Sequence, residues 1–180
     1  MTSSHGPSVL DKFPSLSPQL GLDRVDESFM IELLDTTESK FDMKAVLMLC
    51  NDASNQYNML STTDDGQLTL QNCAQSAACF CDKIVNSNSL FLDAQCVNGS
   101  EYANDVLFAH HSSAKYVAGV PVEFYDDSRV GALCMISTDA DVKLAEEDFD
   151  ELVKQAARLR CKMHAPPGGM VPVHRQNAVS

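Results

Sequence analysis

Four of the seven cysteines, Cys73, Cys79, Cys81 and Cys96, lie in one stretch of the chain and are the residues best suited to chemistry. A cysteine thiolate is a nucleophile and a metal ligand. The first three are separated by five and by one residue, which is not the two-residue spacing of paired zinc ligands, and the histidine pair 110–111 lies in another segment. The sequence therefore predicts no metal site and leaves a redox role for these thiols open.

Composition narrows the classes of partner. The chain has 180 residues, 44% of them hydrophobic, and a formal net charge of −12. An acidic surface repels nucleic acid and anionic membranes, so neither is an expected partner. Residues 1–22 lack the apolar core of a signal peptide, and no apolar run is long enough to span a membrane. We therefore expect a cytoplasmic protein.

Proline and glycine divide the chain into one domain and two tails. Residues 1–22 are rich in serine and proline without a sustained period, which predicts a flexible N-terminal tail. Residues 164–180 contain Pro-Pro-Gly-Gly at 166–169, which ends a helix and predicts a flexible C-terminal tail. A single domain is expected over residues 23–163.

Hydrophobic periodicity predicts the elements that must position the candidate residues. A helix over 23–40 is expected to be capped by Asp23 and to carry one apolar stripe, and a second helix over 146–162 opens with acids, as the helix dipole favours. Strands are expected at 45–50, 57–62, 90–94, 116–124 and 130–137, a short helix at 79–86, a short helix or irregular lid at 102–111, and no regular element at 67–78. The turn at 126–128 joins the last two strands into a hairpin, so the sequence predicts an α+β fold with a mixed, mainly antiparallel sheet and flanking helices.

Five motifs in order resemble those of GAF domains. They are Phe80-Cys81-Asp82-Lys83-Ile84, Leu90-Phe91-Leu92-Asp93-Ala94, the segment 101–107, Tyr116-Val117-Ala118-Gly119-Val120-Pro121, and Gly131-Ala132-Leu133-Cys134-Met135-Ile136-Ser137. The resemblance covers about half the chain directly. It implies a stand-alone sensory or regulatory module that binds a small molecule or a signalling protein and has no catalysis of its own.

The same resemblance implies a ligand pocket between the sheet and residues 102–113. We expect Ala118, Val120, Leu133 and Met135 to form its apolar wall, and Asp93, Asn104 and Tyr116 to orient a small polar ligand. No cofactor is assigned. A homodimer through the apolar stripes of the two long helices is one expectation, and stripes that simply cover the sheet are the other.

Free methionine sulfoxide reduction is the enzymatic alternative that the resemblance raises. It requires a low-pKa thiolate, for which Cys79 or Cys81 near a helix start is the candidate, and a resolving thiol, Cys73 or Cys96. The segment 99–105, where the family's catalytic cysteine is expected, contains none. We therefore expect a binding module, with the thiol-dependent reductase as the alternative.

Overall fold

The structure is a computed structural model of the whole chain. It describes residues 25–51, 56–74, 80–87, 89–95, 107, 111, 113–123 and 129–164. The two predicted tails, apart from His164, and most of the predicted lid at 102–111 lie outside the described residues.

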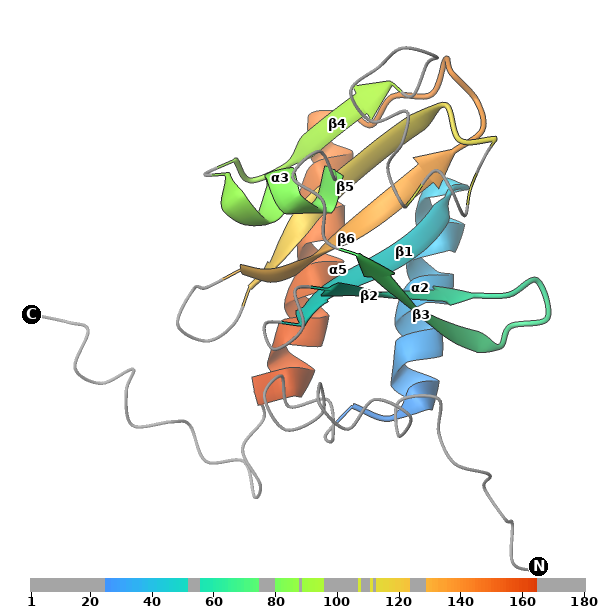
Figure 1. Cartoon of the computed structure of the whole chain (residues 1–180). Coiled ribbons are helices and arrows are strands. Elements are labelled where there is room, and N and C mark those ends of the chain that lie inside the picture. The colour runs from blue at the N-terminus through green and yellow to red at the C-terminus, as the bar shows by residue number, and fades with distance from the viewer. Residues whose placement is uncertain are drawn as a thin grey trace, which may run out of the picture.

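A single six-stranded antiparallel sheet organises the described residues (Figure 1). Its strands are β1 (Lys44–Asn51), β2 (Gln56–Thr62), β3 (Leu68–Ala74), β4 (Leu92–Gln95), β5 (Tyr116–Glu123) and β6 (Arg129–Ser137), in the spatial order β3-β2-β1-β6-β5-β4. The predicted hairpin is confirmed, because β5 pairs with β6 from Tyr116 opposite Ser137 to Glu123 opposite Arg129. The α+β class predicted from the sequence is therefore also confirmed.

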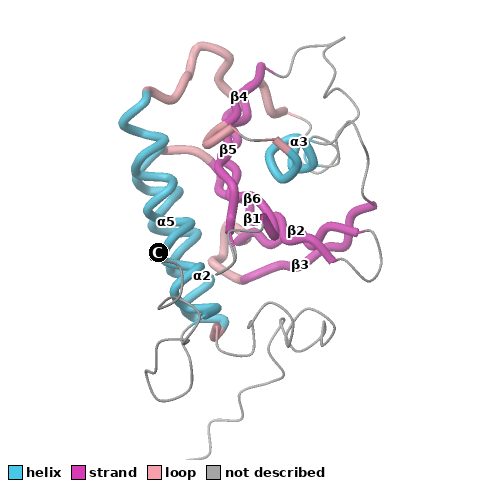
Figure 2. Tube along the Cα trace, turned by 90° about the vertical axis from the view of Figure 1, so that its left-hand side faces the viewer, coloured by secondary structure: helices cyan, strands magenta, loops and turns pink. Residues whose placement is uncertain are grey.

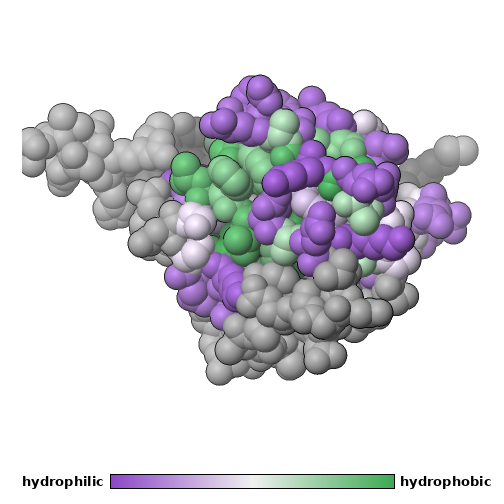
Figure 3. Space-filling model, turned by 90° about the horizontal axis from the view of Figure 1, so that it is seen from above, coloured by the Kyte–Doolittle hydropathy of each residue, from purple (hydrophilic) through white to green (hydrophobic). Residues whose placement is uncertain are grey.

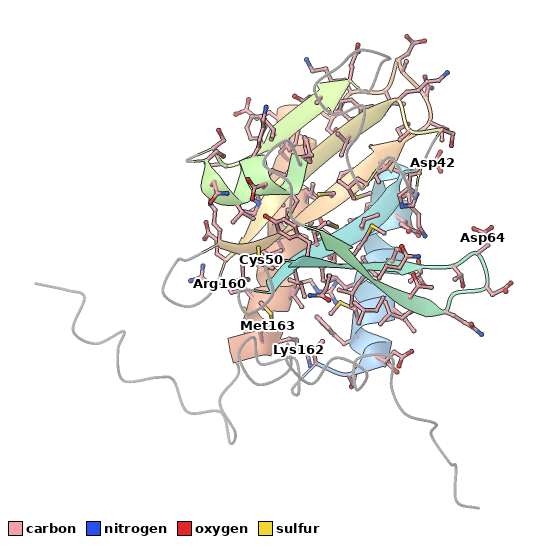
Figure 4. All side chains as sticks on the ribbon, in the orientation of Figure 1. Asp42, Cys50, Asp64, Arg160, Lys162 and Met163 are labelled. Atoms are coloured by element: carbon pink, nitrogen blue, oxygen red, sulfur yellow. The ribbon has the colours of Figure 1, made fainter. Side chains whose placement is uncertain are left out.

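Two long helices cover one face of the sheet. These are α2 (Glu27–Phe41) and α5 (Glu146–His164), and Figure 2 shows both on the same side, with α3 (Phe80–Asn86) on the other. They run antiparallel: Lys162 near the end of α5 lies 5.2 Å from the ring centroid of Phe29 near the start of α2, and Lys40 and Glu151 form an ion pair of 3.1 Å. In Figure 4, Asp42 after α2 and Lys162 accordingly lie at opposite ends of the helical layer.

Side chains alternate between the two faces of the sheet, and each face carries its own buried apolar cluster. On the α2 and α5 side, one cluster includes Leu33, Leu47, Val120, Leu133 and Leu152. On the α3 side, a second cluster includes Val46, Met48, Tyr57, Phe80, Cys81, Ile84, Leu107, Val117, Ala132 and Cys134. The sheet is thus a central layer between two separate cores.

Two expectations for the elements need correction, and one alternative is resolved. Helix α2 begins at Glu27 and is capped by Asp26, whose carboxylate accepts a 2.7 Å hydrogen bond from the Phe29 amide, so Asp23 is not the cap. Strand β3 occupies part of the stretch expected to lack regular structure. Its polar sequence does not predict a strand, and its conformation is stabilised by antiparallel pairing with β2. Of the two expectations for the apolar stripes of the long helices, burial on the sheet is the one observed, with Phe29 partly buried and Val153 exposed.

Candidate functional site

Helix α3 lies directly on strand β5, and a glycine permits the close approach. A Cβ atom placed on Gly119 would lie 2.7 Å from Ile84 Cδ1 and 3.2 Å from both Phe80 Cε1 and Cys134 Sγ. A larger residue here would therefore require the end of the Ile84 side chain to move and the Phe80 ring and the Cys134 thiol to give way. Phe80, Cys81 and Ile84 are the buried residues of the helix, and Val85 packs partly buried on the same core, so the polar residues of the helix are left at its outer surface.

A tyrosine fixes α3 to the opposite half of the sheet. Tyr57, in β2, is fully buried, and its hydroxyl donates a 3.0 Å hydrogen bond to Asp82 Oδ1. A buried tyrosine hydroxyl normally requires such a partner, and the carboxylate is a strong acceptor. This contact sets the position of Asp82 at the surface of α3.

Arg129 holds the end of α3 and the chain that follows it. Its Nη1 donates to the carbonyl of Ile84 at 2.7 Å and to that of Ser87, and its Nη2 donates to the carbonyl of Ser89 at 2.8 Å. The Ile84 carbonyl is in the last turn of α3 and the other two belong to the chain that follows it. A guanidinium can serve several carbonyls at once because its donors form a planar fork. The Arg129 side chain is only 13% exposed, and Glu123 lies 3.9 Å from its Nε.

A polar groove of about 350 Å³ lies beside these contacts. This volume is within the range of about 300–1,000 Å³ that is usual for small-molecule sites. Its lining, from α3, the following turn and β4, is Asp82, Lys83, Asn86, Ser87, Ser89 and Leu92. Five of these six residues are polar by type, although most of the surface that they present to the groove is apolar, and Tyr57 and Arg129 fix the backbone that carries them.

A second polar network ties the β4 edge to the start of α5. The Tyr116 hydroxyl donates to Asp93 Oδ2 at 2.9 Å and accepts from the Leu144 amide at 3.1 Å. Burial, together with the Asp93 carboxylate, raises the pKa of Tyr116 to about 12, whereas the Leu144 amide acts in the opposite direction. The neutral phenol is therefore the form that holds the three segments together.

The residues predicted to bind a ligand are divided by the structure. Asp93 and Tyr116 are brought together, and Asn104 lies outside the described residues. The expected apolar wall is on the opposite face from the expected pocket: its four members are fully buried on the α2 and α5 side, whereas Leu107, from the predicted lid, packs on the α3 side. These members are Ala118, Val120, Leu133 and Met135. Because both faces of the central strands are apolar, the alternation of side chains in the sequence does not identify which face α3 covers.

The redox candidates are only partly described. Cys81 is fully buried in the α3-side core, which separates its thiol from solvent. The side chains of Cys73, Cys79 and Cys96 lie outside the described residues. Cys161, on α5, is the cysteine with an exposed side chain among those described, and it lies in a different part of the molecule from Cys81.

Sequence reasoning missed the groove and its two anchors. Arg129 had a usable signal, since it is a basic residue that opens an otherwise apolar strand directly after an acidic turn in an acidic chain. Tyr57 had a weaker one, a bulky amphipathic side chain at the start of a predicted strand. Neither signal identifies the partner, because Asp82 and the carbonyls near Ser87 are far away in the sequence.

The layered arrangement is that of a GAF-like fold, and solved structures agree. The chain is similar to a GAF domain from the Acinetobacter phosphoenolpyruvate-protein phosphotransferase (TM-score 0.57, 12% identity, covering 86% of this chain and 92% of that chain). It is also similar to the GAF domain of a two-component sensor histidine kinase from Bacillus halodurans (TM-score 0.51, 10% identity, covering 73% and 91%). A third similar structure is a type II free methionine-R-sulfoxide reductase from Thermoplasma acidophilum (TM-score 0.58, 15% identity, covering 81% and 95%).

Likeness at these identities shows the fold alone. No protein-family model and no curated protein matches the chain. In the part of the chain that the structure describes, no helix combines the length and apolar character needed to cross a membrane.

Proposed function

We propose that this protein is a GAF-like regulatory module that binds a small polar molecule in the groove beside α3. Ligand occupancy is its signal, passed to a partner protein, and the module carries no catalysis of its own. It acts in the cytoplasm, without nucleic acid or membrane as a partner, and forms a homodimer. The apolar stripes of α2 and α5 are not the dimer surface, because they are buried on the sheet.

The observation that carries this proposal is the polar groove itself. Asp82 and Lys83 supply charges of both signs, and Asn86 supplies an amide that both donates and accepts. Tyr57 and Arg129 hold α3 and the following turn from two different strands, so the backbone that carries the polar side chains is positioned before a ligand arrives. Preorganisation of this kind reduces the cost of ordering on binding.

The described cysteines supply less support for the enzymatic alternative. A reductase requires an accessible thiolate and a second thiol within roughly 7 Å, measured between Cα atoms. Cys81 is fully buried, and burial in an apolar core disfavours the thiolate. The named sensor kinase among the similar structures fits a sensing role.

Native mass spectrometry of the purified full chain tests the proposal. We expect a retained small molecule, or binding of one identified by screening a polar metabolite library. Asn86→Ala and Lys83→Ala should weaken that binding, whereas Lys154→Ala, at a side chain 74% exposed on α5, should not. Ligand binding of unchanged affinity in both groove variants would refute this site.

Turnover separates the two functions. We expect no reduction of free methionine sulfoxide with a thioredoxin-type reductant. Measurable activity that is lost in Cys81→Ser or Cys79→Ser would replace the binding module with the thiol-dependent reductase.

A further inference from the structure

Strand β3 forms one edge of the sheet and lacks the features that usually protect such an edge. It pairs with β2 in continuous register over seven residues, Leu68 to Ala74, and contains neither proline nor a charged side chain. It lies within residues 66–81, the longest stretch of the sequence without a charged residue. The other edge strand, β4, is only four residues long and carries Asp93. Proteins use short strands, charges and proline to keep an edge from pairing further, so β3 is the edge suited to pairing.

The turn that joins β2 to β3 shows which backbone groups of β3 face outward. The Thr63 amide donates to the Gln67 carbonyl at 2.8 Å, so these two residues form a hydrogen-bonded pair. In an antiparallel ladder, such pairs alternate with pairs whose N–H and C=O groups point away from each other. Leu68 and Leu70 each belong to a pair of the second kind. Their amides and carbonyls therefore point to the outer edge of the sheet.

The neighbouring contacts agree with this assignment. Thr62, opposite Leu68, turns its carbonyl toward β1, where it accepts a hydrogen bond from the Lys44 ammonium. In the described part of the chain no strand lies beyond β3, so the outward groups of Leu68 and Leu70 face no strand there. Leu70 is only partly buried where it packs against the core on the α2 and α5 side. An added strand would pair with this backbone and also complete the cover of Leu70.

The tip of the β2–β3 hairpin gives this edge a negative charge. Asp64 and Asp65 are both exposed, directly before the glycine of the turn. Figure 4 shows Asp64 at the projecting end of the hairpin, and Figure 3, seen from above, shows hydrophilic residues on the same right-hand side of the molecule. Lys44, in β1, is already paired with Glu38 at 3.0 Å. In a chain with a net charge of −12, a complementary partner is therefore basic.

We propose that β3 is the docking edge for an extended, basic segment of a partner protein, which adds a strand antiparallel to β3. Antiparallel pairing matches the other described pairs of the sheet and is slightly more stable per residue than parallel pairing. Alternate residues of the segment are apolar and continue the face of Leu68 and Leu70, whose outward backbone groups bind it. A lysine or arginine after its last strand residue lies beside Asp64 and Asp65. The inference rests on the partner protein of the proposed function and assigns its surface.

Hydrogen exchange measured by nuclear magnetic resonance tests whether this edge is open. In the free full-length chain, the amides of Leu68 and Leu70 should exchange at least about tenfold faster than those of Thr69 and Gln71, which face β2. Equal protection of all four amides would mean that another segment of the chain, or a second copy, already covers the edge. That result would overturn the proposal.

A random peptide library displayed on phage supplies the probe for the partner. We expect the enriched peptides to alternate apolar and polar residues and to carry lysine or arginine after the alternating stretch. In synthetic versions, N-methylation of one alternate set of residues should weaken binding at least about tenfold by fluorescence anisotropy, because those amides face β3, whereas methylation of the other set should not. The bound peptide should also slow exchange at Leu68 and Leu70. Enriched peptides without alternation, or binding that tolerates both methylations, would overturn the proposal.

Charge reversal tests the basic end of the segment. Asp64→Lys combined with Asp65→Lys should weaken binding of the enriched peptide about tenfold. Glu146→Lys combined with Glu147→Lys makes the same change of charge at exposed positions at the start of α5 and should leave the affinity unchanged. Equal loss in both double variants would show that net charge alone attracts the peptide, which would refute docking beside the hairpin tip.

The peptide and ligand measurements keep the two proposals distinguishable. The polar groove is lined by α3, the following turn and β4, whereas the docking edge is β3, at the other side of the sheet. If the chain binds the peptide at β3 but retains no small molecule, only the ligand site is refuted. If it retains a small molecule but selects no alternating peptide, only the docking edge is refuted.

Discussion

Replacing Arg129 by alanine should weaken the attachment of α3 to the sheet, and it should lower the free energy of unfolding more than the loss of an exposed arginine does. The substitution removes three hydrogen bonds from a guanidinium to the carbonyls of Ile84, Ser87 and Ser89. Hydrogen bonds to charged groups contribute about 1.5–3 kcal/mol each, and three that share one side chain are not additive, so we expect a loss of about 2–4 kcal/mol. For a chain of this length, that lowers the unfolding midpoint by roughly 8 °C.

The assay combines urea unfolding with hydrogen exchange of the α3 amides. Arg129→Lys keeps the charge but not the planar fork, and it should recover only part of the loss. Arg158→Ala is the comparison: it removes a largely exposed 2.6 Å ion pair with Glu32 and a 2.9 Å hydrogen bond to Gln155, so it should cost less than Arg129→Ala, about 1 kcal/mol. If Arg129→Ala and Arg158→Ala are equally mild, or if α3 exchange is unchanged, the anchoring role is refuted.

Three further outcomes follow from individual residues. Gly119→Ala should destabilise the fold by about 1–3 kcal/mol, and Ile84→Val, which removes the Cδ1 atom that the new Cβ would approach, should restore part of that loss in urea unfolding. Asp42 ends α2 with a φ of 51°, so Asp42→Gly should stabilise the protein by roughly 0.5–1 kcal/mol in the same assay, whereas Asp42→Ala should not. Tyr116 keeps its proton to about pH 12 when folded, whereas an unfolded tyrosine loses it near pH 10. Its contribution is therefore complete below pH 10 and lost as the pH rises toward 12, and a pH series of unfolding curves should lose this alkaline decline in Tyr116→Phe.

The sequence predicted most elements because their patterns are local. Strand β1 is a continuous apolar run, and α5 opens with acids in the way that a helix dipole favours. Strand β3 was missed because its order depends on pairing with β2, from Thr62 opposite Leu68 to Gln56 opposite Ala74. Such pairing is a tertiary property, and the local sequence of a polar segment does not predict it.

The candidate site was harder to predict for the same reason. The side chains of Tyr57 and Arg129 acquire their roles only when three distant segments meet at α3. The expected apolar wall of the pocket lies on the other face of the sheet for a different reason. Strand β5 is apolar on both faces, so Val120 and Val117 have the same sequence signal although they belong to opposite cores. Only the packing of the helices distinguishes the two faces.

The position of β1 in the sheet also determines when the sheet can be completed during synthesis of the chain. Strand β1 lies between β2 and β6. Strand β2 is the next strand in the chain, whereas β6 is the last strand to be translated. Until Ile136 leaves the ribosome and pairs with Lys44, the nascent β1–β2–β3 meander has an open apolar edge. Completion of the sheet is therefore a late, long-range event. A nascent chain that stalls before β6 should be a better substrate for chaperones than the finished protein.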